Sequence, residues 1–399
     1  MIKETASKIL KEGYVCDHCL GRQFANLLSG YTNDERGRFI RSFLAMEYEV
    51  KPFKVSLSNF YGFIFRKRKL KPDKPGSCVV CKNLFERLPE FAKDAKRKLK
   101  PIDFKTFMVG VKMSDSLAIA EESLWEKSGI AYCESLKSEI NRELGKLIEK
   151  ETGKTADEKK PDVIVMLNLQ NKRIEITINP MYVYGMYKKF ARGIPQTKIS
   201  GYRYSVADMI ARPLIKFTKG SGYRMHACGR EDMKARCLAW RPFILDISQP
   251  LKREINMKNI ERVINKGRKV KVKGLRCSSA KEIVELKKRK MEKVYSVKVS
   301  FKNPVEGIER VKKIVGIVSQ RTPKRILHAQ PDKVRYKKVK NIRWKKISTK
   351  TYEFKIRTDA GLYIKELVTG DNGRTKPSIS GLLKNDGRVE EFDVIRIVM

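Results

Sequence analysis

The sequence predicts an α+β protein whose second half forms a mixed, mainly antiparallel sheet. Residues 133–154, "CESLKSEINRELGKLIEKETGK", repeat apolar residues at helical spacing with charged residues between them. The sheet is predicted from short strand-like runs separated by basic connections: "RPFILDI" (241–247), "KVYSVKVSF" (293–301), "TYEFKIRT" (351–358) and "GLYIKELV" (361–368). A chain of 399 residues can bury more than one core, so we expect two or three domains.

Net charge narrows the function classes. Lysine and arginine number 88 against 45 aspartate and glutamate, a formal net charge of +43. Such a chain attracts a polyanion, and nucleic acid is the leading partner, ahead of an anionic membrane surface or a solvated basic surface without a ligand. No apolar run approaches the roughly 20 residues of a spanning helix, and the first 30 residues carry charges in place of a signal-peptide core. We therefore expect a cytoplasmic protein with no membrane partner.

The N-terminal region contains two CxxC turns. A short amphipathic helix, residues 2–13, leads into "CDHC", and "SCVVC" follows a basic loop, "FRKRKLKPDKPG" (65–76). Two such turns can place four thiolates around one Zn²⁺, which predicts a structural zinc site. Buried or redox-active thiol pairs are the alternative. The predicted ligands are Cys16, Cys19, Cys78 and Cys81, with His18 turned outward and Cys133, Cys228, Cys237 and Cys277 as core thiols.

A helix and a hairpin follow in the first half. The helix at residues 133–154 is expected to pack on a sheet that contains the strands "PDVIVMLNL" (161–169) and "KRIEITI" (172–178). Residues 181–198, "MYVYGMYKKFARGIPQTK", mix tyrosines with basic residues and end at a Gly-Ile-Pro break. This segment is typical of an RNA-facing ribbon with a domain boundary near residue 200, or alternatively of an ordinary sheet edge with solvated lysines.

Residues 311–350 are the most basic region of the chain. They contain 14 lysines and arginines against the single acid Asp332, with Tyr336 and Trp344 among them. Cations neutralise phosphates and aromatic faces stack on unpaired bases, so this composition suits folded RNA with splayed nucleotides.

Most catalytic templates are absent, which leaves a carboxylate as the candidate group. "GSGYRM" lacks the third glycine of a dinucleotide loop, and the chain has neither GxxxxGK[ST] nor HExxH. In "GREDMKAR" (229–236) two carboxylates stand among cations, which would keep one of them ionised as a nucleophile or counter-charge. Glycosidic chemistry on nucleic acid fits such a group, because bond cleavage at an anomeric carbon builds positive charge. A charged surface turn is the alternative.

Four segments resemble a known family. "GREDMKAR" resembles the G-R-x-D motif of pseudouridine synthases. "YGMYKKFARGIPQTK" (184–198), "QRTPKRILH" (320–328) and "GDNGRTKPSISGLL" (370–383) are similar to the Y-G-R-Y-x-K-L-x-R-G-I-P-Q-T, Q-R-T-P-x-R-V-x-H and G-D-x-G-R-T-x-P-S segments of its Pus-ten branch. That branch comprises archaeal and eukaryotic tRNA pseudouridine synthases with an N-terminal zinc- and THUMP-containing accessory domain. The motifs occur in family order and cover almost the whole chain.

The resemblance implies a role for each matching residue. Asp232 would be the catalytic carboxylate, Tyr295 of "KVYSVKV" would stack on the target base, and Lys365 of "GLYIKEL" would pair with Asp232. No metal or cofactor takes part in the family's reaction. The residues expected to bind the substrate uridine are Arg230, Ile364, Phe392 and Arg236, and Glu231 is expected to be scaffolding.

The resemblance also implies tRNA as the partner. The expected RNA-binding residues are Tyr187, Lys188, Lys189, Arg192, Arg321, Arg325, Arg335, Lys337 and Lys338. The chain departs from the family pattern at four positions, where relatives carry a different side chain: Met186, Lys234, Ala329 and Gln330.

These observations define the expected organisation and function. We expect a zinc-binding accessory region at residues 1–100, a THUMP-like RNA-binding region at 101–198 and a catalytic domain at 199–399, in a monomer. The expected activity is conversion of uridine to pseudouridine in the TΨC arm of tRNA, at position 54, 55 or both. A non-catalytic RNA-binding or ribosome-assembly protein and a THUMP-bearing tRNA methyltransferase or thiolation enzyme are the alternatives, and the missing nucleotide loop disfavours the second.

Overall fold

A computed structural model describes residues 1–11 and 13–398. The chain divides into two compact units, Met1–Asn179 and Pro180–Met399. Among the described residues, no helix is long and apolar enough to cross a membrane.

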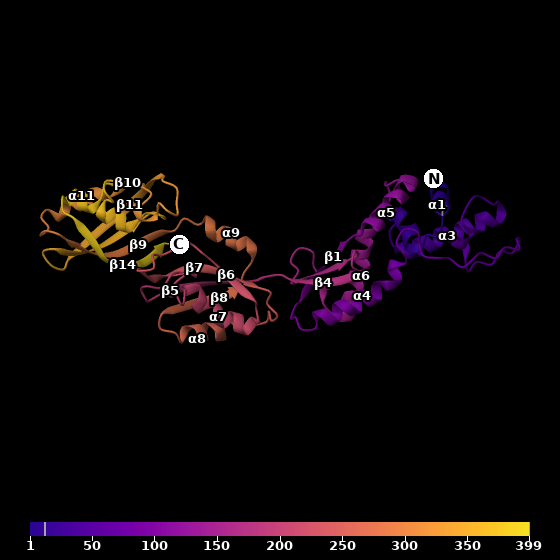
Figure 1. Cartoon of the computed structure of the whole chain (residues 1–399), viewed down its shortest axis with the longest axis horizontal. Coiled ribbons are helices and arrows are strands. Elements are labelled where there is room, and N and C mark those ends of the chain that lie inside the picture. The colour runs from indigo at the N-terminus through magenta and orange to yellow at the C-terminus, as the bar shows by residue number, and fades with distance from the viewer. Residues whose placement is uncertain (12, 399) are drawn as a thin grey trace. The chain divides into compact units, whose positions relative to one another are not determined.

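The first unit is helical at its start and continues into a small sheet. Its helices are α1 (Ile2–Ile9), α2 (Asp17–Gly21), α3 (Asn33–Val50), α4 (Leu84–Leu99), α5 (Asp115–Ser128) and α6 (Leu136–Thr152), with short 3₁₀ turns η1 (Arg22–Phe24) and η2 (Leu57–Phe60). Its strands are β1 (Thr106–Lys112), β2 (Thr155–Ala156), β3 (Val163–Asn168) and β4 (Arg173–Ile178), in the order β2-β1-β3-β4. Helices α4 and α6 pack together beside this sheet (Figure 1).

Sequence patterning explains the elements of the first unit. The helix predicted at residues 133–154 is α6, where the Ser135 side chain caps the N-terminus by accepting a hydrogen bond from the Ser138 amide. The predicted hairpin is also confirmed, because β3 and β4 pair antiparallel. One hydrophobic cluster extends from Ala6 to Ile174, so the unit has no break in its core at residue 100.

The second unit is built on one large sheet. Its strands are β5 (Met181–Lys189), β6 (Gly222–Ala227), β7 (Arg236–Ser248), β8 (Val270–Cys277), β9 (Glu292–Phe301), β10 (Gly316–Arg321), β11 (Val334–Lys346), β12 (Thr351–Thr358), β13 (Thr375–Lys376) and β14 (Gly387–Val398). Their order is β13-β10-β11-β12-β9-β14-β7-β5-β8, and β6 pairs with β7. Only β14 and β7 pair in parallel among the described strands of this sheet, so the predicted mixed, mainly antiparallel sheet is confirmed.

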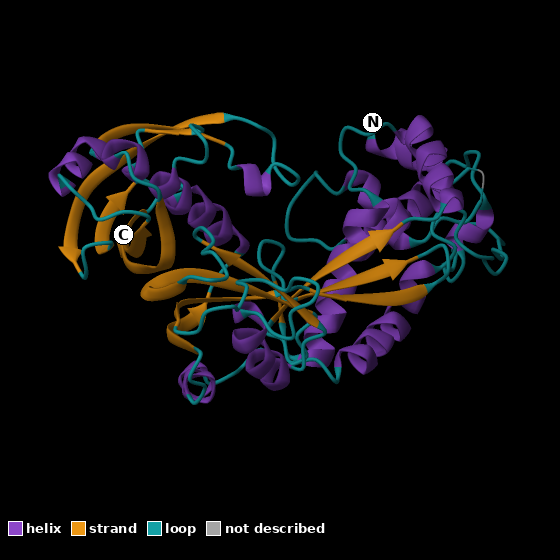
Figure 2. Ribbon diagram, turned by 60° about the vertical axis from the view of Figure 1, so that its left-hand side comes forward, coloured by secondary structure: helices purple, strands orange, loops and turns teal. Residues whose placement is uncertain are grey.

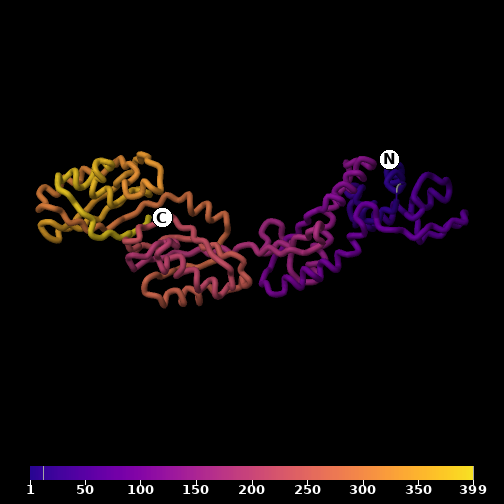
Figure 3. The backbone as a smooth tube through the Cα atoms, viewed as in Figure 1, coloured from indigo at the N-terminus to yellow at the C-terminus, as the bar shows by residue number. Residues whose placement is uncertain are grey.

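Helices and 3₁₀ turns pack against the faces of this sheet (Figure 2). They are α7 (Val206–Thr218), α8 (Met257–Asn265), α9 (Ala280–Lys288), η3 (Ile308–Ile314), η4 (Lys324–Ile326), α10 (Ile364–Thr369) and α11 (Ile379–Leu383). Helices α7 and α8 share one hydrophobic cluster with β5, β7 and β8, while α10 and α11 belong to a second cluster with β9 and β12. Figure 3 traces the backbone from β5 to the C-terminal strand β14, which lies between β9 and β7.

Two sequence expectations differ from the structure. The predicted ribbon at residues 181–198 begins with β5, which lies inside the second unit's sheet and is hydrogen-bonded to β7 on one side and to β8 on the other. The division of the chain therefore falls at residues 179–180 and not near 200, because β5 needs both partners to satisfy its backbone. The strand predicted at 361–368 is wrong: this run contains helix α10, which ends at Gly370 in the left-handed conformation.

Candidate active site

The "GREDMKAR" segment forms the loop that joins the antiparallel strands β6 and β7. Gly229 opens the loop at a φ of +76°, and a Cβ atom there would lie 3.3 Å from both Arg241 Nη1 and Lys293 Nζ. Asp232 closes a turn in which its carbonyl accepts from the Ala235 amide at 3.0 Å and its Oδ1 accepts from the Lys234 amide at 2.9 Å. The loop thus holds the Asp232 carboxylate in a fixed orientation.

Asp232 forms an ion pair with Lys365, as predicted. Lys365 Nζ lies 2.8 Å from Asp232 Oδ2, and the two side chains are 29% and 23% exposed. Partial burial alone would raise the pKa of Asp232. The hydrogen bond from Lys365, the Lys234 amide and the charges of Lys365 and Arg325 outweigh that effect and hold the pKa below its ordinary value. Asp232 is therefore ionised at neutral pH and still partly open to solvent.

Helix α10 places a second charged pair beside the first. Lys365 lies in the first turn of the helix with Glu366 next to it, and Glu366 Oε1 accepts from Arg325 Nε at 2.7 Å. The Glu366 side chain is buried, while Arg325 is 46% exposed. Burial would lower the pKa of Arg325, but the bond to Glu366 and the nearby Asp232 charge raise it. Two consecutive residues of α10 thus hold different partners: Lys365 holds the Asp232 carboxylate and Glu366 holds the exposed Arg325 guanidinium.

A buried polar network supports the loop from below. Glu231 Oε2 lies 3.2 Å from Arg241 Nε, and both side chains are fully buried. Glu231 also accepts from the Tyr187 hydroxyl at 2.8 Å and from Gln196 Nε2 at 3.2 Å. Charges this deeply buried are tolerated only when paired, so this network fixes the Glu231 end of the loop. The expectation that Glu231 is scaffolding agrees with these contacts.

Lys189 and Arg192 fasten the same loop to its surroundings. The Lys189 ammonium donates to the Ile194, Asp232 and Met233 carbonyls at 3.0 to 3.2 Å. Burial lowers the pKa of this lysine. Arg192 donates to the Lys234 carbonyl at 2.8 Å and pairs with Asp393 at 2.8 Å.

Asp393 receives a second cation from β7. Arg236 Nη2 lies 2.6 Å from Asp393 Oδ2, and the Arg236 amide donates to Oδ1 at 2.9 Å. Burial would raise the pKa of Asp393, but these donors lower it. Arg236, predicted to bind substrate, therefore ties β7 to β14 in this structure.

The remaining predicted substrate-binding residues fall into two groups. Ile364 and Phe392 are buried. Ile364 directly precedes Lys365 at the start of α10, and Lys365 Nζ lies 5.2 Å from the centre of the Phe392 ring. Tyr295 is also buried, opposite Ile356 and Val394 in the sheet, and burial raises its pKa to about 12. Arg230 is exposed, and its side chain makes no hydrogen bond or ion pair with another described residue.

The predicted RNA-binding residues separate by burial. Tyr187 and Lys189 are fully buried in the network under the loop, contrary to the prediction that they face RNA, because alternate residues of β5 point into the core. Lys188 is on the opposite face, 4.9 Å from the Trp240 ring centre. Along β11, Lys338 is exposed and Lys337 is half-buried.

The "QRTPKRILH" segment, which carries Arg325, is braced by the "GDNGRT" segment. Arg374 donates to the Thr322 carbonyl at 2.8 Å, and Asp371 accepts from the Lys324 amide at 3.0 Å. Arg321 pairs with Asp332 at 2.9 Å, and Arg335 Nη1 donates to the Thr322 hydroxyl at 2.9 Å. Three of the sequence motifs therefore meet around Asp232.

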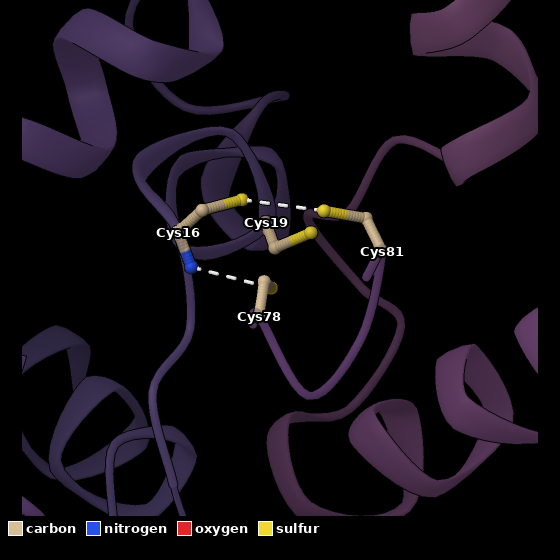
Figure 4. Close-up of side chains that lie close together, drawn as sticks. All are labelled: Cys16, Cys19, Cys78 and Cys81. Carbon is tan, nitrogen blue, oxygen red and sulfur yellow. Dashed lines mark hydrogen bonds between the residues drawn. The ribbon is translucent and has the colours of Figure 1, made fainter. Parts of the chain in front are cut away.

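The four predicted cysteine ligands come together in the first unit (Figure 4). Their sulfur atoms all lie within 4.8 Å of one another, and Cys16 Sγ and Cys81 Sγ are 3.5 Å apart. Sulfurs at ~2.3 Å from a tetrahedral ion would be about 3.8 Å apart, so the cluster fits a metal ion. The buried Arg22 donates to Cys19 Sγ at 3.2 Å, which suits thiolate ligands. His18 is outside the cluster, stacked on Phe85 with ring centres 4.0 Å apart.

Sequence reasoning missed the residues that hold the predicted ones in place. Arg241, Gln196 and Glu366 lie within the quoted motifs or strand-like runs, and Asp393 directly follows Phe392. Glu366 directly follows Lys365, and a carboxylate beside a predicted site lysine was the signal in the sequence that could have identified it. Nothing in the linear sequence pairs Glu231 with Arg241, because that contact depends on the register of β7 with β5.

Comparison with known proteins gives a consistent result. The family model described as "Pus10, C-terminal" matches residues 182–398, and "Pus10 THUMP domain, archaeal" matches residues 91–168. The tRNA pseudouridine synthase Pus10 of Pyrococcus furiosus is 37% identical over 100% of this chain and 98% of its own length. The protein of that name from Methanothrix thermoacetophila is also 37% identical, over 98% of this chain and 94% of its own.

A solved structure also aligns with part of the chain. A chain in the crystal structure of a Cbf5-Nop10-Gar1 complex covers 54% of this chain and 48% of its own length, with 16% sequence identity and a TM-score of 0.32. A superposition with that score is too loose to assign a fold.

Proposed function

The chain belongs to the Pus10 family of tRNA pseudouridine synthases, which are isomerases, and we propose that it converts uridine to pseudouridine in tRNA with Asp232 as its catalytic carboxylate. The observation that carries the assignment of Asp232 is its ion pair with Lys365 at 2.8 Å, next to the buried Ile364 and Phe392. An ionised, oriented carboxylate at an apolar edge is what attack at a ribose anomeric carbon requires.

The reaction is an isomerisation in which all heavy atoms stay on the substrate. The bond between C1′ and N1 breaks while Asp232 traps or stabilises the positive charge that develops at C1′. The detached uracil turns and forms a bond from C5 to C1′. The C5 proton is released to solvent and N1 gains a proton, so charge and atoms balance. Tyr295, Ile364 and Phe392 would contact the base during this turn, Lys365 would keep Asp232 ionised, and Arg230 would contact the target nucleotide.

The tRNA position that we propose is in the TΨC arm, at 54, 55 or both. Exposed cations near Asp232 support a substrate with phosphates on this face, and Arg325 is the best placed of them because Glu366 holds it there. Arg321, Arg335, Lys337 and Lys338 extend the same basic segment of the chain. Arg236 would act indirectly, by fixing β14, and not by touching the uridine.

The metal that we propose for the four-cysteine cluster is Zn²⁺, in a structural role. Four cysteines are a common set of structural zinc ligands, and such a closed set leaves no position for a substrate. The ion would hold together the start of the first unit and take no part in the isomerisation. We place the enzyme in the cytoplasm, where thiolate ligands remain reduced.

Tritium release tests the proposed reaction directly. With tRNA transcripts labelled at uracil C5, the wild-type protein should release tritium and Asp232→Asn should release none, because an amide cannot attack C1′. Glu390→Gln, at an exposed carboxylate of β14, is the control and should retain wild-type release. Pseudouridine mapping of the product then identifies the position. Unchanged release by Asp232→Asn would rule out the proposed catalytic residue.

A further inference from the structure

Residues 61–74, "YGFIFRKRKLKPDK", form an exposed segment that we call the basic loop. Within it, residues 66–74 contain six lysines and arginines and one acid, Asp73. No side chain of the six is in an ion pair with any residue that the structure describes, and Arg68 alone among them is half-buried. The exposed cations are Arg66, Lys67, Lys69, Lys71 and Lys74. Like charges this dense repel one another, so the loop is suited to an anionic partner.

The basic loop also presents apolar surface and encloses a hollow. A cavity of about 770 Å³ is lined by consecutive residues 61–72. At its rim Ile64 is 93% exposed and Tyr61 is 52% exposed. A single apolar side chain on a surface needs no explanation, but here an aromatic and an aliphatic side chain stand among unpaired cations. Cations for phosphates and an aromatic face for a base are the two components of single-stranded RNA binding.

Both ends of the basic loop are fixed. Phe63 and Phe65 pack on Phe60 with ring centres 6.4 and 6.1 Å apart, and Glu49 accepts from the Lys67 amide. At the other end the chain runs directly into Cys78 of the metal cluster. Because both ends of the basic loop are held, the loop loses less conformational entropy when its cations bind a ligand.

We propose that the basic loop is an RNA-docking surface of the first unit, which binds backbone phosphates and an unpaired base of tRNA. This inference rests on the proposed function for its ligand. An acidic polypeptide or an anionic membrane would match the charge but would not use the hollow beside Tyr61. The metal cluster then has a functional consequence, because it anchors one end of a docking surface.

Substitution of four of the exposed cations tests the proposal in the full chain. The variant Arg66→Gln/Lys67→Gln/Lys69→Gln/Lys71→Gln should bind unmodified tRNA about tenfold or more weakly than wild type. The slope of log Kd against log salt concentration should fall by roughly 0.9 for each phosphate that the loop no longer neutralises. In tritium release, KM should rise while kcat stays unchanged, since Asp232 is in the other unit.

Two matched variants separate the loop from general charge. Lys8→Gln/Lys11→Gln/Arg38→Gln/Lys51→Gln removes the same charge from exposed sites of the first unit that lie outside both the basic loop and the THUMP match at residues 91–168. Arg66→Lys/Lys67→Arg/Lys69→Arg/Lys71→Arg keeps the charge of the loop. The control with charge removed outside the loop should bind tRNA more tightly than the loop variant does. The variant that keeps the charge of the loop should bind tRNA like wild type. Circular dichroism melting checks that all variants are folded.

The outcomes discriminate between the inference and the proposed function. Equal weakening in the loop variant and in the Lys8/Lys11/Arg38/Lys51 control, or no weakening in either, would overturn the docking surface. The proposal would also be overturned if the loop variant bound tRNA like wild type but no longer bound polyglutamate or phosphatidylserine vesicles. If wild type releases no tritium while the loop variant alone loses tRNA affinity, the inference stands and the proposed function fails.

Discussion

The Asp232 carboxylate is held by one side chain and one backbone amide, and these two partners place different demands on the sequence. The backbone amide of residue 234 can be supplied by any amino acid except proline, so the exposed Lys234, where the family resemblance implied an acid, keeps this hydrogen bond. The ammonium of Lys365 is harder to replace. Its hydrogen bond is the largest of the influences that lower the pKa of Asp232, ahead of the Lys234 amide, and only a cationic side chain supplies both that bond and a positive charge. The departure at position 234 is therefore compatible with catalysis.

The pH dependence of the reaction tests the role of Lys365. Because the folded pKa of Asp232 lies below its ordinary value, wild-type kcat/KM should stay high until the pH falls below that value. Lys365→Met removes the largest lowering influence and leaves the burial that raises the pKa. The acidic limb of the pH–rate profile should therefore move to higher pH, and the rate should fall. Lys365→Arg should keep the acidic limb near its wild-type pH. If the acidic limb did not move in Lys365→Met, Lys365 would not be the group that lowers the pKa of Asp232.

The buried pair of Glu231 and Arg241 should be important for stability. Glu231→Gln leaves the fully buried Arg241 cation without its counter-charge, which typically destabilises a protein by roughly 3–5 kcal/mol. Urea unfolding should show this decrease in the free energy of unfolding. Glu390→Gln should change it by about 0.5 kcal/mol or less. If Glu231→Gln lowered the free energy of unfolding by no more than Glu390→Gln does, the Glu231–Arg241 pair would contribute little to stability.

At the scale of elements, the β6–β7 loop and helix α10 together build the site. The loop supplies the carboxylate, and the first turn of α10 supplies Lys365 and Glu366, which fix Asp232 and Arg325. Strand β5 contributes from beneath, through Tyr187 and Lys189. Lys365 and Glu366, which carry opposite charges at adjacent positions of α10, thus orient the Asp232 carboxylate and the Arg325 guanidinium.

The conformation of the loop can be tested at its glycine. Gly229→Ala places a Cβ atom 3.3 Å from two buried cationic groups and keeps a residue at a φ of +76°, where side chains cost about 1–2 kcal/mol. We expect a similar decrease in the free energy of unfolding and a lower kcat, because Asp232 shifts with the loop. Gly222→Ala, in β6 of the same hairpin and at an ordinary φ, should affect neither. Equal effects from both would show that the loop tolerates a side chain.

At the scale of the whole molecule, the chain forms two units with separate cores. The four-cysteine cluster is in the first unit and Asp232 is in the second. The first unit has one hydrophobic cluster and the second has two, so we expect each unit to unfold in a transition of its own.

Metal removal should act on the first unit alone. Chelation, or Cys78→Ser, should lower the melting temperature of the first unit, because structural zinc contributes folding free energy, while the second unit melts as before. Scanning calorimetry with zinc analysis measures both. Cys277 is exposed, contrary to the prediction that it is a core thiol, and it lies outside the cluster, so Cys277→Ser should retain one equivalent of zinc and both transitions. Freshly purified wild type with far less than one equivalent would contradict the zinc site.

The sequence by itself determined the α+β class and the four-cysteine cluster, which follow from alternation in strands and from CxxC spacing. It also determined Asp232 and Lys365 as partners, but only through the resemblance of its motifs to a known family. The tertiary structure alone decided that Tyr187 and Lys189 are buried, that β5 belongs to the large sheet, and that "GLYIKELV" contains a helix. The physical reason is that burial depends on which strands flank a segment. A lysine in a basic segment is solvated at a sheet edge, but between β7 and β8 it must find carbonyl partners, and Lys189 finds them in the loop that holds Asp232.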